Sequence, residues 1–191
     1  MSPRKLEIHQ VAATLMRQKG YANTTVRDIA SEMNMEAASL YNHIASKEEI
    51  LANICFQFAD QLEQGILEIN DIYFNAKEKL KMAITQHILL LTQDLDASYV
   101  FIHEWKYLTD DKKVEFITRR DVYEKQFRDI VVLGEKEGSF LEVDQKFAVI
   151  TILSAINATI EWYKPSGSLT PQQVADKLTN FILTGLSNPH H

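Results

Sequence analysis

Apolar residues recur every three or four positions along nearly the whole chain, and this spacing constrains the fold more than any other feature of the sequence. No segment alternates apolar and polar residues between hairpin turns, which is the pattern of a half-buried strand. We therefore expect an all-α protein. The predicted helices lie near 6–19, 26–33, 36–43, 47–70, 77–94, 97–108, 110–137, 144–163 and 171–186.

Helix-capping residues mark several of these boundaries. Gly20 is expected to end the first helix in a left-handed conformation. Thr25 and Asp28 predict a capping box, in which the hydroxyl accepts a free backbone N–H and the carboxylate reaches back. Asn34 tolerates a positive φ and is expected at the turn before the third helix. Ser46 begins a second capping box at the start of the long helix.

The net charge of −6 is distributed unevenly. Residues 1–47 carry six basic and four acidic side chains, a net +2, so the remaining residues carry −8. A positive N-terminal part can approach phosphates, whereas an acidic remainder is repelled by them, and this suits a nucleic-acid-binding protein. Many acidic enzymes show similar local variation, so charge alone does not separate the two classes.

Three further features limit the class of protein. No stretch approaches the roughly 20 uninterrupted apolar residues of a membrane span, so no membrane partner is expected. The first residues lack the apolar segment and cleavage site of a signal peptide. Cys55 is the only cysteine and permits neither an intramolecular disulfide nor a cysteine-based zinc cluster. These features together predict a cytoplasmic protein.

The two short helices at 26–33 and 36–43, with the turn between them, have the spacing of a helix-turn-helix. The residues that fill this region are more specific than the spacing. They are Gly20-Tyr21, Thr24 to Ala30, Leu40 to His43 and Ser46 to Leu51. In this order they closely resemble the N-terminal signature of the TetR family of transcriptional regulators.

This resemblance implies an N-terminal three-helix helix-turn-helix head over residues 1–46. It also implies a C-terminal antiparallel helical body over 47–191 that senses a ligand and dimerises. The chain is therefore expected to be a repressor and not an enzyme. A small, largely apolar effector is expected to release this repressor from a palindromic DNA operator. Three residues depart from the family pattern, since Asn34 replaces a usual glycine, Glu36 a usual capping Ser or Thr, and Ile44 a usual Phe. A particular operator sequence therefore cannot be transferred.

A weaker resemblance lies in the body. It rests on Arg120 to Arg128, Gly134, Glu137-Gly138, Trp162 to Pro165 with Gly167, and Leu183 to Leu186. These residues look like a branch of the family that regulates fatty-acid and sterol breakdown. Several members of that branch respond to acyl-CoA thioesters, so the resemblance adds an acyl-CoA to the expected effectors.

The third helix is expected to read bases in the major groove. Ser39 and Asn42 can hydrogen-bond base edges, and Ala37 and Ala38 are small enough to meet a thymine methyl group. Leu40 and Ile44 are expected to turn inward, away from DNA. Glu36 is better explained by attraction to the positive end of the helix dipole than by base reading.

Other residues around this helix are expected to hold DNA phosphates. The family resemblance implies this role for Tyr41 and His43. Lys47, beside free N–H groups at a helix start, would bind another phosphate. Helix capping explains Thr25 equally well, and Tyr41 is also explained as partly core. The predicted DNA-binding residues are Thr24, Thr25, Arg27, Ala37, Ala38, Ser39, Tyr41, Asn42, His43 and Lys47.

The segment from Phe147 to Ile160 is apolar nearly all round, so a helix there needs cover on both sides. One side can meet its own body and the other a second copy of the chain. We expect the helices near 144–163 and 171–186 to form a two-fold symmetric four-helix interface in a homodimer. Two heads spaced roughly 34–36 Å apart can then read a palindrome. The alternative is a large core in a monomer.

An effector pocket needs apolar walls and a few polar groups. Core packing explains each predicted pocket residue at least as well when it is taken alone. Arg119, Arg120 and Arg128 would attract a phosphorylated or CoA-bearing ligand, or form a solvated helix face. The predicted pocket residues are Ile84, His87, Ile88, Leu91, Phe101, His103, Trp105, Tyr123, Phe127, Ile130, Asn157 and Trp162.

Two other classes of protein are alternatives to a transcriptional regulator. An enzyme is disfavoured because the chain has no Gly-rich phosphate loop, no HExxH and no nucleophile elbow. No spacing fixes a metal site at His87, His103 and Glu104, and no metal or cofactor is expected. A helical adaptor that binds only protein predicts no operator affinity. Activation instead of repression stays open, as does whether His190-His191 is native or the remnant of a tag.

Overall fold

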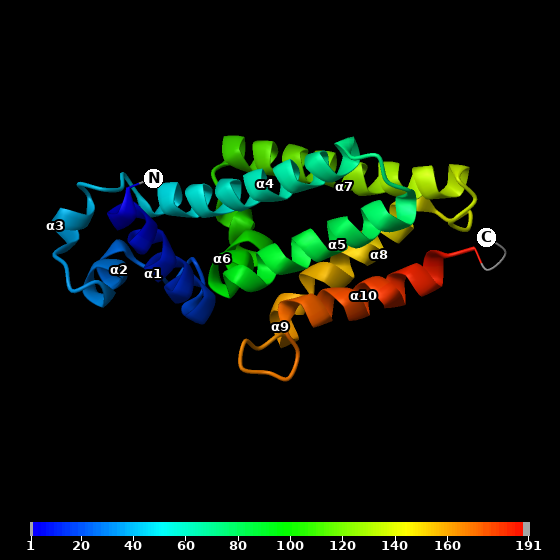
Figure 1. Ribbon diagram of the computed structural model, residues 1–191. Helices are drawn as coiled ribbons and strands as arrows, with labels where there is room; N and C mark the ends of the chain where they lie inside the picture. The colour runs from blue at the N-terminus through cyan, green and yellow to red at the C-terminus, as the bar shows by residue number, and fades with distance from the viewer. Residues whose placement is uncertain (1, 189–191) are drawn as a thin grey trace. The chain divides into compact units, whose positions relative to one another are not determined.

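The computed structural model describes residues 2–188, and most of them lie in helices (Figure 1). The β pairing in this range is one isolated bridge between Phe140 and Ser187. The prediction of an all-α fold is therefore confirmed. His190 and His191 lie outside the described residues. The helices are α1 (Pro3–Lys19), α2 (Val26–Glu32), α3 (Ala37–Leu40), α4 (Lys47–Asp71), α5 (Ala76–Gln93), α6 (Leu95–Tyr99), the π-helix η1 (Val100–Glu104), the 3₁₀-helix η2 (Trp105–Tyr107), α7 (Asp110–Lys136), α8 (Gln145–Asn157), α9 (Thr159–Trp162) and α10 (Pro171–Leu186).

The chain folds into two compact units. The head unit consists of the residues up to 59 together with 94–118, and the body unit of 60–93 together with the residues from 119 onward. Helices α4 and α7 each supply residues to both units. The predicted boundary at residue 46 does not coincide with this division, because Ile50 and Leu51 of α4 are fully buried in the core of the head unit. A DNA-binding domain confined to 1–46 stays a prediction.

The head unit is built on α1 and on the first turns of α4. Ile8 and Met16 of α1 pack with Ile50 in an apolar core that excludes water. Cys55 belongs to this core, and burial, with the nearby charge of Glu104, raises the pKa of its thiol to about 12. Gly20 ends α1 with the predicted positive φ of 81°, but its ψ of 154° is extended instead of left-handed helical.

The body unit is organised around α5, which contacts α8, α9 and α10. One face of α5 is fully buried, as Leu80, Ile84 and Ile88 show. Burying such a face contributes about 25 cal/mol per Å² of apolar surface removed from water. Thr170 caps α10 with the capping-box partner Gln173, and this explains why the predicted bounds of 171–186 agree with the structure.

Two predicted helices are interrupted. The helix expected over 97–108 begins at Leu95 because Asp94 accepts backbone N–H groups there, and it then becomes the π-helix η1 and the 3₁₀-helix η2. The helix expected over 144–163 breaks at Ala158 into α8 and α9. No helix within residues 2–188 is long and apolar enough to cross a membrane.

Candidate DNA-binding and effector sites

The helix-turn-helix of the head unit has the predicted local geometry. Thr25 and Asp28 form the complete capping box at the start of α2. Asn34 takes the expected positive φ, at 52°. Helix α3 is shorter than predicted, because the N–H groups of Asn42 and His43 bond three residues back to Ser39 and Leu40. The chain therefore leaves the α-helical pattern at Tyr41 while it still turns in a helical sense.

The outward side of α3 and of the turn that follows it carries most of the residues predicted to read DNA. Leu40 and Ile44 are buried in the head core, as predicted. Ala37 is half-buried. The exposed residues are Ala38, Ser39, Tyr41, Asn42 and His43. These side chains are available to a partner surface, and their contacts with DNA stay a prediction.

The residues predicted to clamp phosphates fall into two groups. Thr25 and Arg27 are exposed at the start of α2. Thr24 is fully buried, and its hydroxyl donates to the Gly20 carbonyl oxygen at 2.9 Å. Lys47 Nζ donates to the Tyr21 carbonyl oxygen at 2.9 Å and lies 4.1 Å from the centre of the Tyr21 ring. Thr24 and Lys47 thus already have structural roles within the head unit.

Electrostatic contacts hold α1 and α2 in place. Lys19 Nζ pairs with Asp28 Oδ2 at 2.8 Å. The Lys19 hydrogen bond, followed by those from Thr25, lowers the pKa of Asp28 to about 2. At the start of α4, the Ser46 hydroxyl accepts the Glu49 N–H at 3.1 Å. The Glu49 carboxylate accepts the N–H of Ala45, whereas in a standard capping box it would accept the N–H of Ser46.

Tyr21 connects three segments of the head unit. Its hydroxyl donates to Glu48 Oε1 at 3.1 Å, and its backbone N–H donates to Glu104 Oε2 at 3.2 Å. Its ring stacks on Tyr107 with 5.2 Å between ring centroids. Burial, followed by the Glu48 hydrogen bond, raises the pKa of Tyr21. Sequence reasoning gave Tyr21 no role and considered Glu104 only as a metal ligand, although an acid within the apolar run 100–105 is a signal of a buried partner.

A second polar connection joins α6 to α1 within the head unit. Arg17 donates to Asp96 Oδ1 at 2.9 Å, and Thr14 donates to Asp96 Oδ2 at 2.6 Å. Asp96 and Glu104 therefore bind the segment from 94 to 107 to α1 and to Tyr21, which follows it.

Replacing Glu104 by alanine is expected to lower the free energy of unfolding by about 1–3 kcal/mol, because the Tyr21 N–H then lies buried without an acceptor. Urea unfolding monitored by circular dichroism measures the change. Glu115→Ala, at an exposed position on α7, is the matched control and is expected to change the free energy by less than about 0.5 kcal/mol. Equal effects of the two substitutions would contradict the role assigned to Glu104.

The twelve residues predicted to line an effector pocket divide between the two units. Phe101, His103 and Trp105 belong to the head unit, where Trp105 stacks on Phe116 with 5.5 Å between centroids. The other nine belong to the body unit. Of these, Trp162 is exposed and Asn157 half-buried, and the rest are core residues: Ile84, His87, Ile88, Leu91, Tyr123, Phe127 and Ile130. Their role in effector binding stays a prediction.

His87 and Tyr123 form a polar pair inside the body unit. The Tyr123 oxygen and His87 Nδ1 are 3.2 Å apart, and the two rings meet edge to face. Burial lowers the pKa of His87 to about 3, so this imidazole is neutral at pH 7. His87 Nε2 and Asn157 Oδ1 are buried and have no hydrogen-bond partner among the described residues.

The arginines considered for an anionic ligand have different surroundings in the body unit. Arg119 donates to both carboxylate oxygens of Glu63, at 2.7 and 2.9 Å, and also binds Asp60. The Glu63 hydrogen bond, as the main cause, raises the pKa of Arg119. The guanidinium of Arg119 is therefore used within the protein, whereas Arg128 Nε is buried without a partner among residues 2–188.

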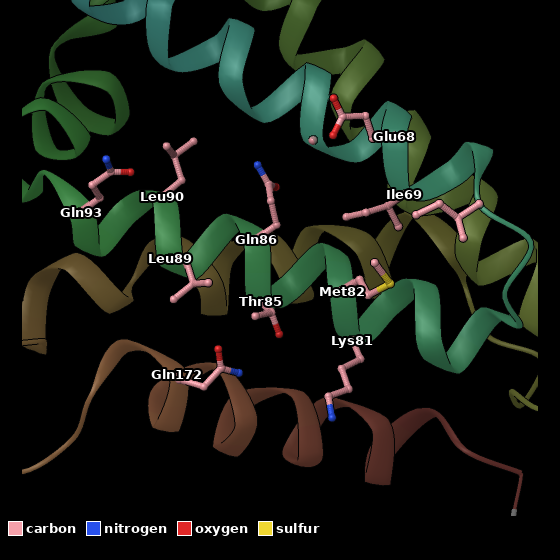
Figure 2. A pocket seen from close by; sticks show the side chains of 12 residues that line it. Glu68, Ile69, Lys81, Met82, Thr85, Gln86, Leu89, Leu90, Gln93 and Gln172 are labelled. Carbon is pink, nitrogen blue, oxygen red and sulfur yellow. The ribbon is translucent and has the colours of Figure 1, made fainter.

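The body unit also contains an open groove of about 610 Å³ on a different face of α5 (Figure 2). It runs between α5 and the last turns of α4 and reaches Gln172 of α10. Ile69, Met82 and Leu90 contribute apolar walls. None of its lining residues was predicted from the sequence.

A stripe of exposed residues follows α8 into α9. Phe147 is 71% exposed and Ile150 45% exposed, and the stripe continues through Ser154 and Ala158 to Trp162. On α10, Phe181 is 79% exposed. Large apolar side chains at such spacing mark a surface that a partner covers. This stripe, together with Phe181, lies on the helices near 144–163 and 171–186 that are predicted to form the dimer interface.

Comparisons with known proteins agree with this arrangement. Residues 8–54 match the family model of bacterial regulatory proteins, tetR family, and residues 74–186 match the model of a tetracyclin repressor-like C-terminal domain. The HTH-type transcriptional repressor KstR2 of Mycolicibacterium smegmatis is 30% identical over 188 residues, which cover 96% of this chain and 91% of that protein.

Two solved structures resemble the whole chain. The ketosteroid transcriptional regulator KstR2 of Mycobacterium tuberculosis gives a TM-score of 0.93 at 27% identity, covering 98% of this chain and 97% of that one. The structure of AibR in complex with isovaleryl coenzyme A and operator DNA gives a TM-score of 0.82 at 28% identity. The match covers 93% of this chain and 97% of that one. The chain belongs to the TetR family of bacterial regulatory proteins. It is a ligand-responsive, DNA-binding transcriptional regulator and not an enzyme, and regulators of this family bind operator DNA as dimers.

Proposed function

We infer that this protein is a repressor that binds a palindromic operator as a homodimer and leaves it when a small, largely apolar effector binds the body unit. The exposed strip on α3 and the following turn carries this inference, because it combines a helix-turn-helix with side chains suited to base edges. A repressor of this kind acts on DNA in the cytoplasm.

The exposed stripe on α8 and α10 supports the homodimer. Phe147 and Phe181 would each bury most of their apolar surface against a second copy, and two-fold symmetry brings the same patch to both sides. Such an interface of four helices, two from each copy, joins two heads so that they can read two half-sites.

The relatives support a repressor and an acyl-CoA effector. KstR2 of Mycolicibacterium smegmatis is called a repressor, and AibR was solved with isovaleryl coenzyme A, a short-chain acyl thioester, and with operator DNA. For this chain an acyl-CoA is therefore one class of effector to test. The predicted interior residues around His87 and Tyr123 are one of two candidate sites in the body unit, because His87 Nε2 has no partner in the described part of the chain.

Release follows from a shift between two conformations of the dimer. An effector that binds one conformation better raises its population, and heads held at a spacing that does not match the operator dissociate. A difference of about 2–4 kcal/mol per dimer between the two conformations is enough to change operator occupancy decisively.

Selection of bound duplexes from a random DNA pool at two salt concentrations tests the proposed function. A recovered palindrome, bound less tightly at the higher salt concentration, is the expected result. Failure of the folded protein to enrich any sequence without effector would contradict it and would favour an adaptor that binds only protein.

Two substitutions in the head are expected to affect DNA binding differently. Asn42→Ala should weaken binding to the selected operator by about 1–3 kcal/mol and leave binding to unrelated DNA unchanged, because a base contact is lost. Arg27→Ala should weaken binding to both and make the salt dependence shallower by about one unit, because a phosphate contact is lost. Fluorescence anisotropy at several salt concentrations measures both. The reverse pattern would contradict the assigned roles.

A further inference from the structure

The groove on the outer face of α5 divides into an apolar side and a polar side. In Figure 2, Gln86 and Leu90 extend from α5 toward α4, whereas Lys81 and Thr85 extend toward α10. Its volume of about 610 Å³ falls within the range of roughly 300–1,000 Å³ that small-molecule sites occupy.

The apolar side exposes side chains that water solvates poorly. Ile72 at the end of α4 is 39% exposed, and Leu90 of α5 is half-buried. Ile69 and Met82 continue this surface between the two helices. A hydrocarbon chain or ring system laid along it would remove apolar surface from water on both the ligand and the protein.

The polar side offers a cation without an internal partner. Lys81 is exposed and forms no ion pair or hydrogen bond with any residue in the described range 2–188. Glu68, the acid that lines the groove, lies on the α4 wall, whereas Lys81 extends toward α10, and Glu68 accepts a hydrogen bond from Gln64 at 2.9 Å. Thr85 and Gln172 add neutral hydrogen-bonding groups on the α10 side of the groove, where Lys81 also lies. An anionic group fits this end of the groove better than a cationic one.

Gln86 supplies a second, independent sign of a missing partner. Its Nε2 donates to the Gln61 carbonyl oxygen at 3.3 Å, while its Oε1 is buried and has no partner among the described residues. Gly65 of α4 leaves room for this amide, since a Cβ there would overlap the Gln86 side chain. A buried acceptor without a donor costs free energy, which a ligand O–H or N–H would recover.

We propose that this groove is the effector site and that its ligand is an amphipathic anion, with its hydrocarbon part between α4 and α5 and its anionic group at Lys81. The proposal rests on the proposed function, because it assigns the site and the chemical class of the effector. The anion is a free carboxylate or a phosphate carried by a thioester, and the experiment separates these two sources.

The position of the groove gives a ligand there a direct effect on regulation. Its α4 wall, from Gly65 to Ile72, belongs to the same continuous helix that supplies Ile50 and Leu51 to the head core. Its other wall contains Gln172 of α10, the helix proposed to hold the dimer. A ligand that contacts both helices therefore binds differently to conformations in which these helices differ.

Calorimetric titration of the full-length protein with three probes tests the proposal. The probes are dodecanoate, dodecanoyl-CoA and uncharged dodecanol. At least one anionic probe is expected to bind about three- to fivefold more tightly than dodecanol, because an exposed charge pair contributes at most about 1 kcal/mol. Operator release by the same probe is followed by fluorescence anisotropy.

Two substitutions place the ligand in the groove. Ile72→Asp is expected to weaken binding of all three probes at least about tenfold, because it puts a charge on the apolar wall between α4 and α5. Lys81→Gln is expected to weaken only the anionic probes, to about the affinity of dodecanol. The matched controls are Val122→Asp, at an exposed apolar position of α7, and Lys164→Gln, at an exposed lysine after α9, and both should bind like the unmodified protein.

The possible failures are distinguishable. If the unmodified protein binds none of the probes, or if Ile72→Asp binds and responds like the unmodified protein, the groove assignment is overturned while operator binding still stands. Binding in the groove without operator release would also overturn it as an effector site. If His87→Leu abolishes the response to effector and Ile72→Asp does not, the effector site is the interior pair of His87 and Tyr123 instead of the groove. Absence of operator binding in all proteins would instead refute the proposed function.

Discussion

The double substitution Phe147→Asp with Phe181→Asp is expected to yield a folded monomer that binds the operator at least about a hundredfold more weakly. Both side chains are largely exposed, so the change need not disturb the core of the body unit. Four carboxylates would lie within the two-fold interface of α8 and α10, where an unpaired buried charge is costly. A monomer then loses the second head, and bivalent attachment accounts for about 10²–10⁴ in apparent affinity.

Sedimentation velocity gives the oligomeric state, and fluorescence anisotropy gives the operator affinity. Val122→Asp is the control, because Val122 is 49% exposed on α7, away from the stripe on α8 and α10. It should remain dimeric and keep its operator affinity. A double variant that stays dimeric would show that another surface joins the two copies.

Acidification from pH 7 to pH 5 is expected to lower the free energy of unfolding by about 4 kcal/mol, with about half from each of two buried histidines. Burial, as the main cause, lowers the pKa of His87 to about 3 and that of His9 to about 4, with Lys5 a further cause for His9. Both imidazoles are thus neutral in the folded protein at pH 5. In the unfolded chain they titrate near 6.5 and take up protons, so acid favours unfolding.

Urea unfolding at several pH values between 5 and 7 measures this dependence. Glu48 and Glu49 have lowered pKa values, so their stabilising effect is lost only in more acidic solution, below their ordinary range. His87→Gln and His9→Gln should each remove about half of the pH dependence. Tyr123→Phe removes the hydrogen bond to His87 but keeps the imidazole, and it should retain the full dependence. A stability that does not change over this range would contradict the prediction.

The helix-turn-helix was predictable from the sequence because the starts of its helices and the turn between them depend on local chemistry. The capping box of Thr25, the positive φ of Asn34 and the inward direction of Leu40 follow from residue type and helical spacing. The roles of Lys47 and Thr24 inside the head could not be predicted from the sequence. These side chains donate to the carbonyl oxygens of Tyr21 and Gly20, which only the folded loop brings into reach.

The body was predictable as a set of helices but not as a set of sites. Apolar residues at helical spacing show that Ile84 and Phe127 face inward, but a wall of packed core and a wall of a pocket have the same pattern. The same spacing does not distinguish an α-turn from the π-turn of η1. The groove joins Lys81 to Gln172, which lie in helices far apart in the sequence, so no local pattern indicates it.

Because Cys55 is the only cysteine and lies fully buried in the head core, it serves as a built-in reporter of how often that core opens. A thiol reagent modifies it only during such openings, since the folded state both covers the sulfur and disfavours its reactive thiolate. The labelling rate is followed by mass spectrometry with and without operator or effector. It gives the free energy of opening of the head-unit core without any engineered probe.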